Sequence, residues 1–257
     1  MLDKEIQNVF TEILNIGEHM LRAGGEVYRV EDTISRLICA YGGKKPHVFA
    51  IPSNIIVTAT FEGNEITHTR RVPSAEINFE ILDRMNDLAR RVCHEKPNAG
   101  ELKQMVENAL TLKKYGHAGK MFIYALVSFS FAMFFGGSFA DAAVSAVIGV
   151  LLYPATQMIN SQRSVQGNII FIDILCAAIS AFFACLAVRV GIAHDADKII
   201  IGNVMLLIPG VELVNGMRDF IAGDIQAGMM HVFEALFLAI CIAIGAAGVL
   251  TLMGVIL

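Results

Sequence analysis

The sequence predicts two parts of different fold class: an α+β domain over residues 1–118 and an all-α membrane domain of five transmembrane helices over residues 119–257. The chain is 55% hydrophobic with a mean hydropathy of +0.57, which is too apolar for an ordinary soluble protein. Charge is uneven, because residues 1–120 hold 16 of the 20 Lys and Arg and 16 of the 24 Asp and Glu. Long apolar runs begin directly afterwards, so we expect about four helices and a small antiparallel sheet, then bilayer-spanning helices.

Two glycine pairs divide the start of the chain into two helices. Apolar residues recur at helical spacing from Ile6 until Gly24-Gly25 ends the pattern. A second amphipathic helix is predicted over residues 27–41. Its opposite face carries five charged residues: Glu26, Arg29, Glu31, Asp32 and Arg36. A solvated face with salt bridges is the plainest interpretation. The same residues are also candidates for docking this domain under the spans, for gating entry or for a hydrolytic site.

The period then changes from helical to alternating. A short apolar stretch at 47–51 is followed by alternation over 55–61, a turn at 62–64 and a return strand at 65–72. These segments predict an antiparallel sheet of about three strands.

Two more helices complete the first domain. Apolar positions at helical spacing over 77–92 predict the first, and Pro97 ends it. Asn98 followed by Glu101 has the form of a capping box and predicts a helix that reaches about residue 112.

Five apolar runs follow, and we assign one transmembrane helix to each. A hydrocarbon core of roughly 30 Å needs about 20 residues at a rise of about 1.5 Å per residue. The runs lie at 121–137, 139–159, 169–190, 199–216 and 228–257. The first and the fourth are near the short limit.

Basic residues beside the runs predict the orientation. With the N-terminus inside, the cytoplasmic side holds Lys113, Lys114, Lys120, Arg163 and Arg218. Arg189 and Lys198 fall outside. The positive-inside rule favours this arrangement, so we expect a bacterial inner-membrane protein with a cytoplasmic N-terminus and an outer C-terminus. The start, MLDKEIQNVF, shows no signal-peptide pattern, so insertion is expected to use the internal runs.

The fourth run breaks the rules for a membrane helix. Pro209 removes a backbone donor and Gly210 loosens the helix. Glu212 and Asn215 follow within about two turns. In hydrocarbon, a loosened backbone is tolerated only where protein or trapped water satisfies it. We therefore expect this run to line a polar path.

Ionisable residues in and beside the runs are the candidates for function. Those within the runs are Asp141, Asp173, Glu212, His231 and Glu234, and those in the link after the fourth run are Arg218, Asp219 and Asp224. A carboxylate at the membrane centre costs roughly 2.5–3.5 kcal/mol on insertion scales, so it needs a partner, a proton or water. The alternatives are an interfacial carboxylate for Asp173 and Glu234, a packing residue for His231, and loop capping for Asp219 and Asp224.

Other function classes find little support. There is no basic patch of the size that nucleic-acid binding needs. The five cysteines form no CxxC or Cys/His cluster, and no metal spacing, phosphate loop or nucleophile elbow is present. We therefore expect no enzyme activity, no metal and no cofactor. A membrane scaffold or sensor without transport remains a different class to be tested.

Two stretches together match a family signature. The first is Gly24-Gly25-Glu26 followed by RVEDT at residues 29–33, and the second combines Pro209-Gly210, Asn215, Arg218-Asp219, Gly223-Asp224 and Gly228. In this order they resemble the threonine/serine exporter family, in its five-span form, over nearly the whole chain. The resemblance implies export of threonine and serine driven by the proton motive force. Enterobacterial members are tied instead to C4-dicarboxylates such as succinate. It also implies a second short membrane subunit that supplies further spans, and hence a hetero-oligomer.

These observations suggest a mechanism for such an exporter. A helix N-terminus at the break in the fourth run suits a substrate carboxylate. Desolvation raises a carboxyl pKa, so Glu212, Asp173 and Glu234 are the expected proton carriers. Arg218 is expected to receive the substrate carboxylate from the cytoplasm, because its guanidinium forms a bidentate fork.

Overall fold

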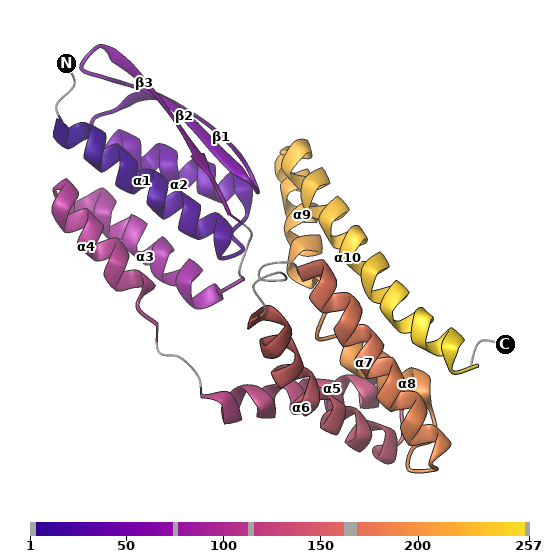
Figure 1. Cartoon of the computed structure of the whole chain (residues 1–257). Coiled ribbons are helices and arrows are strands. Elements are labelled where there is room, and N and C mark those ends of the chain that lie inside the picture. Colours follow the sequence, from indigo (N-terminus) through magenta and orange to yellow (C-terminus); the bar gives the residue numbers. More distant parts are fainter. Residues whose placement is uncertain (1–3, 74–76, 113–115, 162–168, 255–257) are drawn as a thin grey trace. The chain divides into compact units, whose positions relative to one another are not determined.

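The computed structural model describes residues 4–73, 77–112, 116–161 and 169–254. Figure 1 shows the elements in chain order. The first part holds α1 (Lys4–Arg22), α2 (Val27–Ala40), β1 (Lys44–Ile51), β2 (Asn54–Phe61), β3 (Asn64–Arg71), α3 (Phe79–Glu95) and α4 (Ala99–Leu110). The second part holds α5 (His117–Phe134), α6 (Phe139–Ser161), α7 (Ile169–Arg189), α8 (Ala196–Val204), α9 (Gly210–Ala222) and α10 (Ile225–Leu252).

Contacts group these elements into two compact units. The first unit joins Met1–Lys113 with Gly210–Glu234, and the second joins Lys114–Pro209 with Ala235–Leu257. Helix α9 and the start of α10 thus pack with the N-terminal elements. The expected division at residue 118 into a cytoplasmic domain and a membrane domain stays a prediction.

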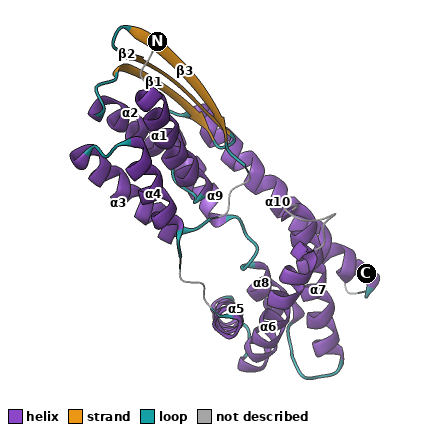
Figure 2. Ribbon diagram, turned by 60° about the vertical axis from the view of Figure 1, so that its left-hand side comes forward, coloured by secondary structure: helices purple, strands orange, loops and turns teal. Residues whose placement is uncertain are grey.

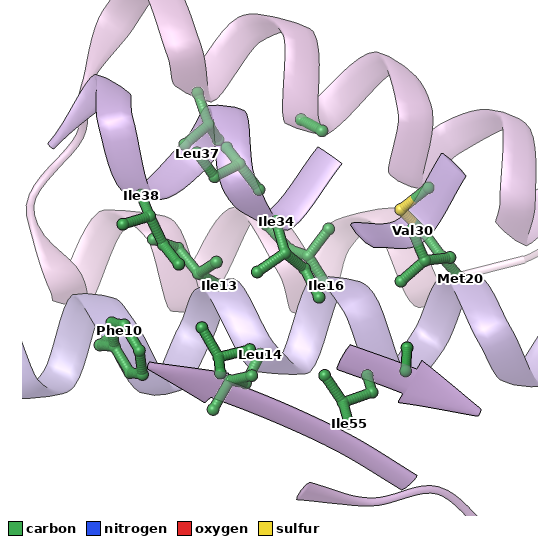
Figure 3. Close-up of a cluster of buried hydrophobic side chains, with 14 of the residues drawn as sticks. Phe10, Ile13, Leu14, Ile16, Met20, Val30, Ile34, Leu37, Ile38 and Ile55 are labelled. Atoms are coloured by element: carbon green, nitrogen blue, oxygen red, sulfur yellow. The ribbon is translucent and has the colours of Figure 1, made fainter. Parts of the chain in front are cut away.

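Helices α1 and α2 form a layer between the sheet and the α3–α4 pair (Figures 1 and 2). Both helices are amphipathic, and their apolar faces meet the inner face of the sheet. Figure 3 shows Phe10, Leu14, Ile34 and Ile55 among the buried side chains of α1, α2 and β2. Burial of these apolar surfaces is the main force that holds the layers together.

The sheet has the order β1-β2-β3 and is antiparallel throughout, as predicted. Alternate residues of β2 are buried, which is the alternation that the sequence shows. The turn between β2 and β3 places Glu62 at φ 49° and Gly63 at φ 82°. Two successive positive φ values are typical of the tight hairpin turn that matches the twist of its strands.

Helices α3 and α4 each begin at an asparagine cap. The Asn98 side chain accepts from the backbone N–H of Glu101, whose own side chain accepts from the Asn98 N–H, so the predicted capping box is confirmed. Helix α4 ends at Leu110 instead of the predicted residue 112. Asn78 caps α3 in a similar way, accepting from the N–H groups of Glu80 and Ile81.

Four helices among the described residues are long and apolar enough to span a membrane: α5, α6, α7 and α10. They correspond to four of the five predicted spans. The expectation of a fifth spanning helix over 199–216 is corrected, because this run forms the separate helices α8, with 9 residues, and α9, with 13 residues. At a rise of about 1.5 Å per residue, neither is long enough to cross roughly 30 Å of hydrocarbon.

The predicted break in this run is present and is wider than expected. Helix α8 ends at Val204, before Pro209 is reached. The N–H groups of Leu206 and Leu207 donate to the carbonyls of Asn203 and Val204 at 3.1 and 2.8 Å, which is 3₁₀-type bonding. The chain therefore leaves the α-helix through a tight turn, and a new helix, α9, begins at Gly210 directly after Pro209.

In the second unit, small and polar residues let α5, α6 and α8 approach one another. The Ser145 hydroxyl donates to the Ser128 carbonyl at 3.1 Å. The Asn203 amide donates to the Ser145 hydroxyl at 3.2 Å and to the Ile199 carbonyl at 2.9 Å. A Cβ at Gly202 would lie 2.9 Å from the Ser128 carbonyl oxygen. Such contacts are typical of helices that pack within a bilayer.

The predicted orientation used three basic residues that lie outside the described residues: Lys113, Lys114 and Arg163. A cytoplasmic N-terminus and an outer C-terminus stay predictions.

Candidate functional site

Residues 24–27 and helix α9 are joined by three contacts within the first unit, each between residues 191 or 192 positions apart. We call the six residues that make these contacts the clasp: Gly24, Glu26, Val27, Asn215, Arg218 and Asp219. The two signature stretches of the sequence thus contact each other directly.

The end of α1 presents the first half of the clasp. Gly24 has a φ of +90°, which favours glycine. Its N–H donates to the Leu21 carbonyl at 3.0 Å, and the Gly25 N–H donates to the Met20 carbonyl at 2.9 Å, which is a Schellman ending. A Cβ at Gly25 would lie 2.8 Å from the Met20 oxygen. The turn leaves the Gly24 carbonyl to accept from the Asn215 side chain at 2.9 Å.

Glu26 is a buried carboxylate, with 6% of its surface exposed. It forms an ion pair with Arg218 of α9 and a longer one, at 3.6 Å, with Arg29. A buried charge is costly without such partners. Arg218, which the sequence suggested as a receptor for the substrate carboxylate, is therefore engaged by Glu26. Substrate would have to replace Glu26 at this guanidinium.

Asp219 is fully buried and caps a helix other than its own. Helix α2 begins at Val27, and the Glu26 side chain at its N-cap makes no capping hydrogen bond. The Val27 N–H donates instead to Asp219 Oδ1 at 3.2 Å. An anion at a helix N-terminus satisfies a free N–H and interacts favourably with the helix dipole. The loop-capping alternative for Asp219 thus becomes a contact between distant parts of the chain.

Two glycines bring a histidine to Asp219. A Cβ at Gly216 in α9 would lie 3.1 Å from the Gly228 carbonyl of α10, and one at Gly228 would lie 2.9 Å from the Gly216 carbonyl. This approach places His231 Nε2 3.7 Å from Asp219 Oδ2. His231 was expected to be a packing residue, but it faces a buried carboxylate.

The electrostatic setting of Asp219 disfavours its charge. Burial raises the pKa of the Asp219 carboxyl to about 6. The Val27 N–H opposes this rise, whereas the charges of Asp224 and Glu26 add to it. Burial also raises the pKa of Glu31 in the neighbouring α2, and the charges of Asp224 and Asp219 add to that rise too.

A cavity of ≈ 980 Å³ lies in the first unit. Its charged and polar lining includes Glu212, Asn215, His231, Glu234 and Arg71, and much of the rest is apolar. The volume lies in the range of small-molecule sites, and the pattern of an apolar wall with few polar groups is typical of them. The structure thus brings three predicted residues together: Glu212, Asn215 and Glu234.

The other charged residues of α2 lie elsewhere. Asp32 forms an exposed salt bridge with Arg36 at 2.8 Å, as the plainest interpretation expects. Glu31 accepts from the Ala50 N–H of β1 at 2.6 Å and so ties α2 to the sheet. Arg29 is half exposed beside Glu26.

The remaining predicted residues are dispersed. Asp173 is buried in α7 of the second unit, so its part in one path with Glu212 stays a prediction. Pro209 lies between α8 and α9. Asp224 lies between α9 and α10, and its carbonyl accepts from the Gly228 N–H at 3.0 Å.

Asp141 is a structural cap. Its carboxylate accepts from the Ser138 N–H and hydroxyl at 2.9 and 2.7 Å. It also accepts from the backbone N–H groups of His194 and Asp195 at 2.7 and 3.1 Å. These four bonds account for its burial without a transport role.

Sequence reasoning missed two features of the site. Arg71, the last residue of β3, was not singled out, although it lines the cavity. The pairing of His231 with Asp219 was not foreseen either. The sequence did hold a sign that His231 belongs to the site. It follows Gly228 of the family signature by three residues and so lies on the same face of α10.

Comparisons with known proteins concern the chain as a whole. A family model described as "Putative threonine/serine exporter" matches residues 12–253. A protein of Klebsiella aerogenes named "Probable succinate transporter subunit YjjP" is 24% identical over 255 residues, which cover 98% of this chain and 97% of that protein. No solved structure matches the chain. The chain is a membrane protein, because it has several helices that are apolar enough to span a bilayer and it matches a family of exporters. Because the family model covers nearly the whole chain, this protein belongs to the threonine/serine exporter family.

Proposed function

We propose that this chain is one subunit of an inner-membrane exporter that carries threonine and serine out of the cell, driven by the proton motive force. The observation that carries the proposal is the cavity of the first unit, with its carboxylates and its arginine. The family assignment supports export as the activity.

The charges of the cavity suit a zwitterion. Glu212 and Glu234 offer two carboxylates to a substrate ammonium group. Arg71 offers a guanidinium, which can hold a carboxylate through two parallel hydrogen bonds. Glu212 also lies in the first turn of α9, where free N–H groups favour an anionic ligand. An α-amino acid carries both charges that this lining can bind.

The same carboxylates provide a means of proton coupling. A substrate ammonium group binds an ionised carboxylate, and a proton on that carboxylate removes the attraction. Substrate and proton therefore compete for Glu212 and Glu234, which is the relation that an antiporter needs. Asp173 remains a proposed further proton carrier in the second unit.

The second candidate substrate is a C4-dicarboxylate such as succinate. The name of the Klebsiella aerogenes relative favours it. The cavity favours it less, because two carboxylates would repel a dianion unless they were protonated. Protonated Glu212 and Glu234 beside Arg71 would give the site a net positive charge and permit such a substrate.

A further subunit is part of the proposal. The relative is named as a transporter subunit, and the described residues contain four candidate spans. We propose that a short membrane protein encoded beside this chain supplies further spans, in a hetero-oligomer.

Counterflow in proteoliposomes that contain both proteins tests the substrate. Vesicles are loaded with unlabelled threonine, serine or succinate, and the uptake of the same labelled compound is followed. We expect accumulation of labelled threonine and serine above protein-free vesicles. Accumulation of succinate alone would establish the dicarboxylate alternative. No accumulation of any of the three would contradict export and favour a scaffold or sensor.

A further inference from the structure

Among the described residues of the first unit, four buried side-chain atoms have no hydrogen-bond partner: Arg22 Nε, Asp219 Oδ2, His231 Nδ1 and His231 Nε2. Buried polar groups are nearly always hydrogen-bonded, so each exception needs a physical explanation. Two of these atoms, Asp219 Oδ2 and His231 Nε2, face each other at 3.7 Å. One proton between them would give each a partner.

We propose that Asp219 and His231 bind one proton between them and that the protonated pair is the closed form of the clasp. The proton comes from water. It lies on Asp219 Oδ2, which donates it to Nε2 of a neutral His231. Oδ1 still accepts from the Val27 N–H.

The charges around the pair favour a bound proton. Glu26 precedes α2, Glu31 lies in α2, and Asp224 precedes α10, so three further acidic groups act on this region from neighbouring elements. On α9 itself, the nearest cation is Arg218, which Glu26 engages. Burial raises the pKa of the Asp219 carboxyl to about 6, which supports the same conclusion.

The direction of the pH effect follows from linkage. When the clasp opens, α2 separates from α9, so water reaches Asp219 and its pKa returns toward the ordinary value of about 3.9. His231 stays packed against Gly216 of α9 and is neutral in both forms. Between about pH 4 and pH 6 the closed clasp therefore holds more protons than the open one, and it weakens as pH rises through this window. With an Asp219 pKa of about 6 in the closed clasp and about 3.9 in the open one, the equilibrium constant for opening rises about tenfold between pH 5 and pH 7.5.

The pair adjoins the proposed substrate cavity. His231 and Asn215 both line that cavity. Asn215 belongs to the clasp, because its side-chain amide donates to the Gly24 carbonyl. Loss of the proton thus loosens the contact between α2 and α9 beside the cavity. The inference deepens the proposed function, because it adds a proton site that would regulate access, and it rests on that function only for its role in transport.

Hydrogen exchange of the full chain in detergent, followed by mass spectrometry, tests the pair without any substrate. Peptides that contain the Val27 amide are compared between pH 5 and pH 7.5 after correction for intrinsic exchange rates. Asp219→Asn is the informative variant, because its amide can accept from Val27 and donate to His231 Nε2 at every pH. Asp87→Asn is the matched control, since Asp87 pairs with Arg90 on the exposed surface of α3.

We expect protection of the Val27 region to fall about tenfold from pH 5 to pH 7.5 in the wild type and in Asp87→Asn. Protection in Asp219→Asn should stay close to the wild-type value at pH 5 throughout. A wild-type profile that is flat with pH overturns the proposal, and this result does not depend on the folding of any variant. An equal pH effect in Asp219→Asn overturns it too. Because no transport is measured, either result is separate from the outcome of the counterflow test.

Discussion

At the scale of single residues, the clasp shows how an acidic side chain can be kept inside the protein. Glu26 is buried and paired, and Asp219 is buried at the N-terminus of α2. The sequence marked both residues as candidates. It assigned Arg218 to the substrate, because the sequence alone does not reveal a partner almost two hundred positions away. Glu212 was singled out from its place after Pro209, and it does line the cavity.

The Glu26–Arg218 pair can be tested by a double-mutant cycle. Arg218→Met leaves a buried carboxylate with only the longer contact to Arg29, so it should lower the free energy of unfolding by about 1–3 kcal/mol. Glu26→Gln combined with Arg218→Met should cost clearly less than the two single changes together. Unfolding of the full chain in detergent provides the measurement.

The exposed Asp32–Arg36 pair serves as its control. The coupling energy in that pair should be no more than about 0.5 kcal/mol. Equal coupling in the two pairs would show that Glu26 is not held as the structure indicates.

At the scale of elements, periodicity predicted α1 to α4 and the sheet, because each has one apolar face that the core needs. The capping box of α4 was visible in the sequence for the same reason, since it depends on residues three positions apart. The end of α8 was not predictable, because nothing in the residues after Val204 stops a helix before Pro209. The close approach of α9 and α10 was hidden as well, although Gly216 and Gly228 permit it.

Gly216→Val tests that approach. Its side chain would meet Val232 and the Gly228 carbonyl, where an added Cβ already lies at 2.9 and 3.1 Å. We expect a loss of about 1–3 kcal/mol in the free energy of unfolding, since neighbouring backbone must move. Gly100→Val in α4 is the matched control, because a Cβ there meets only the Asn98 side chain at 3.4 Å. Its stability should change little, and a similar loss in both variants would argue against tight α9–α10 packing.

At the scale of the whole molecule, the chain returns to its first domain after three apolar helices. Residues 210–234 join the N-terminal elements in one unit and complete the cavity there. The sequence predicted the order of the parts and the membrane class. It could not predict this return, because local patterns of hydrophobicity carry no information on which distant segments pack together. The central claim is that the carboxylates of this cavity couple protons to export.

Efflux of labelled threonine from proteoliposomes that contain both subunits, with and without an imposed proton gradient, tests that claim most directly. The gradient should accelerate efflux through the wild type and through Glu107→Gln, a control on the exposed face of α4. In Glu212→Gln the acceleration should disappear while the protein remains in the membrane. Gradient-driven efflux at the wild-type rate in Glu212→Gln would contradict the account.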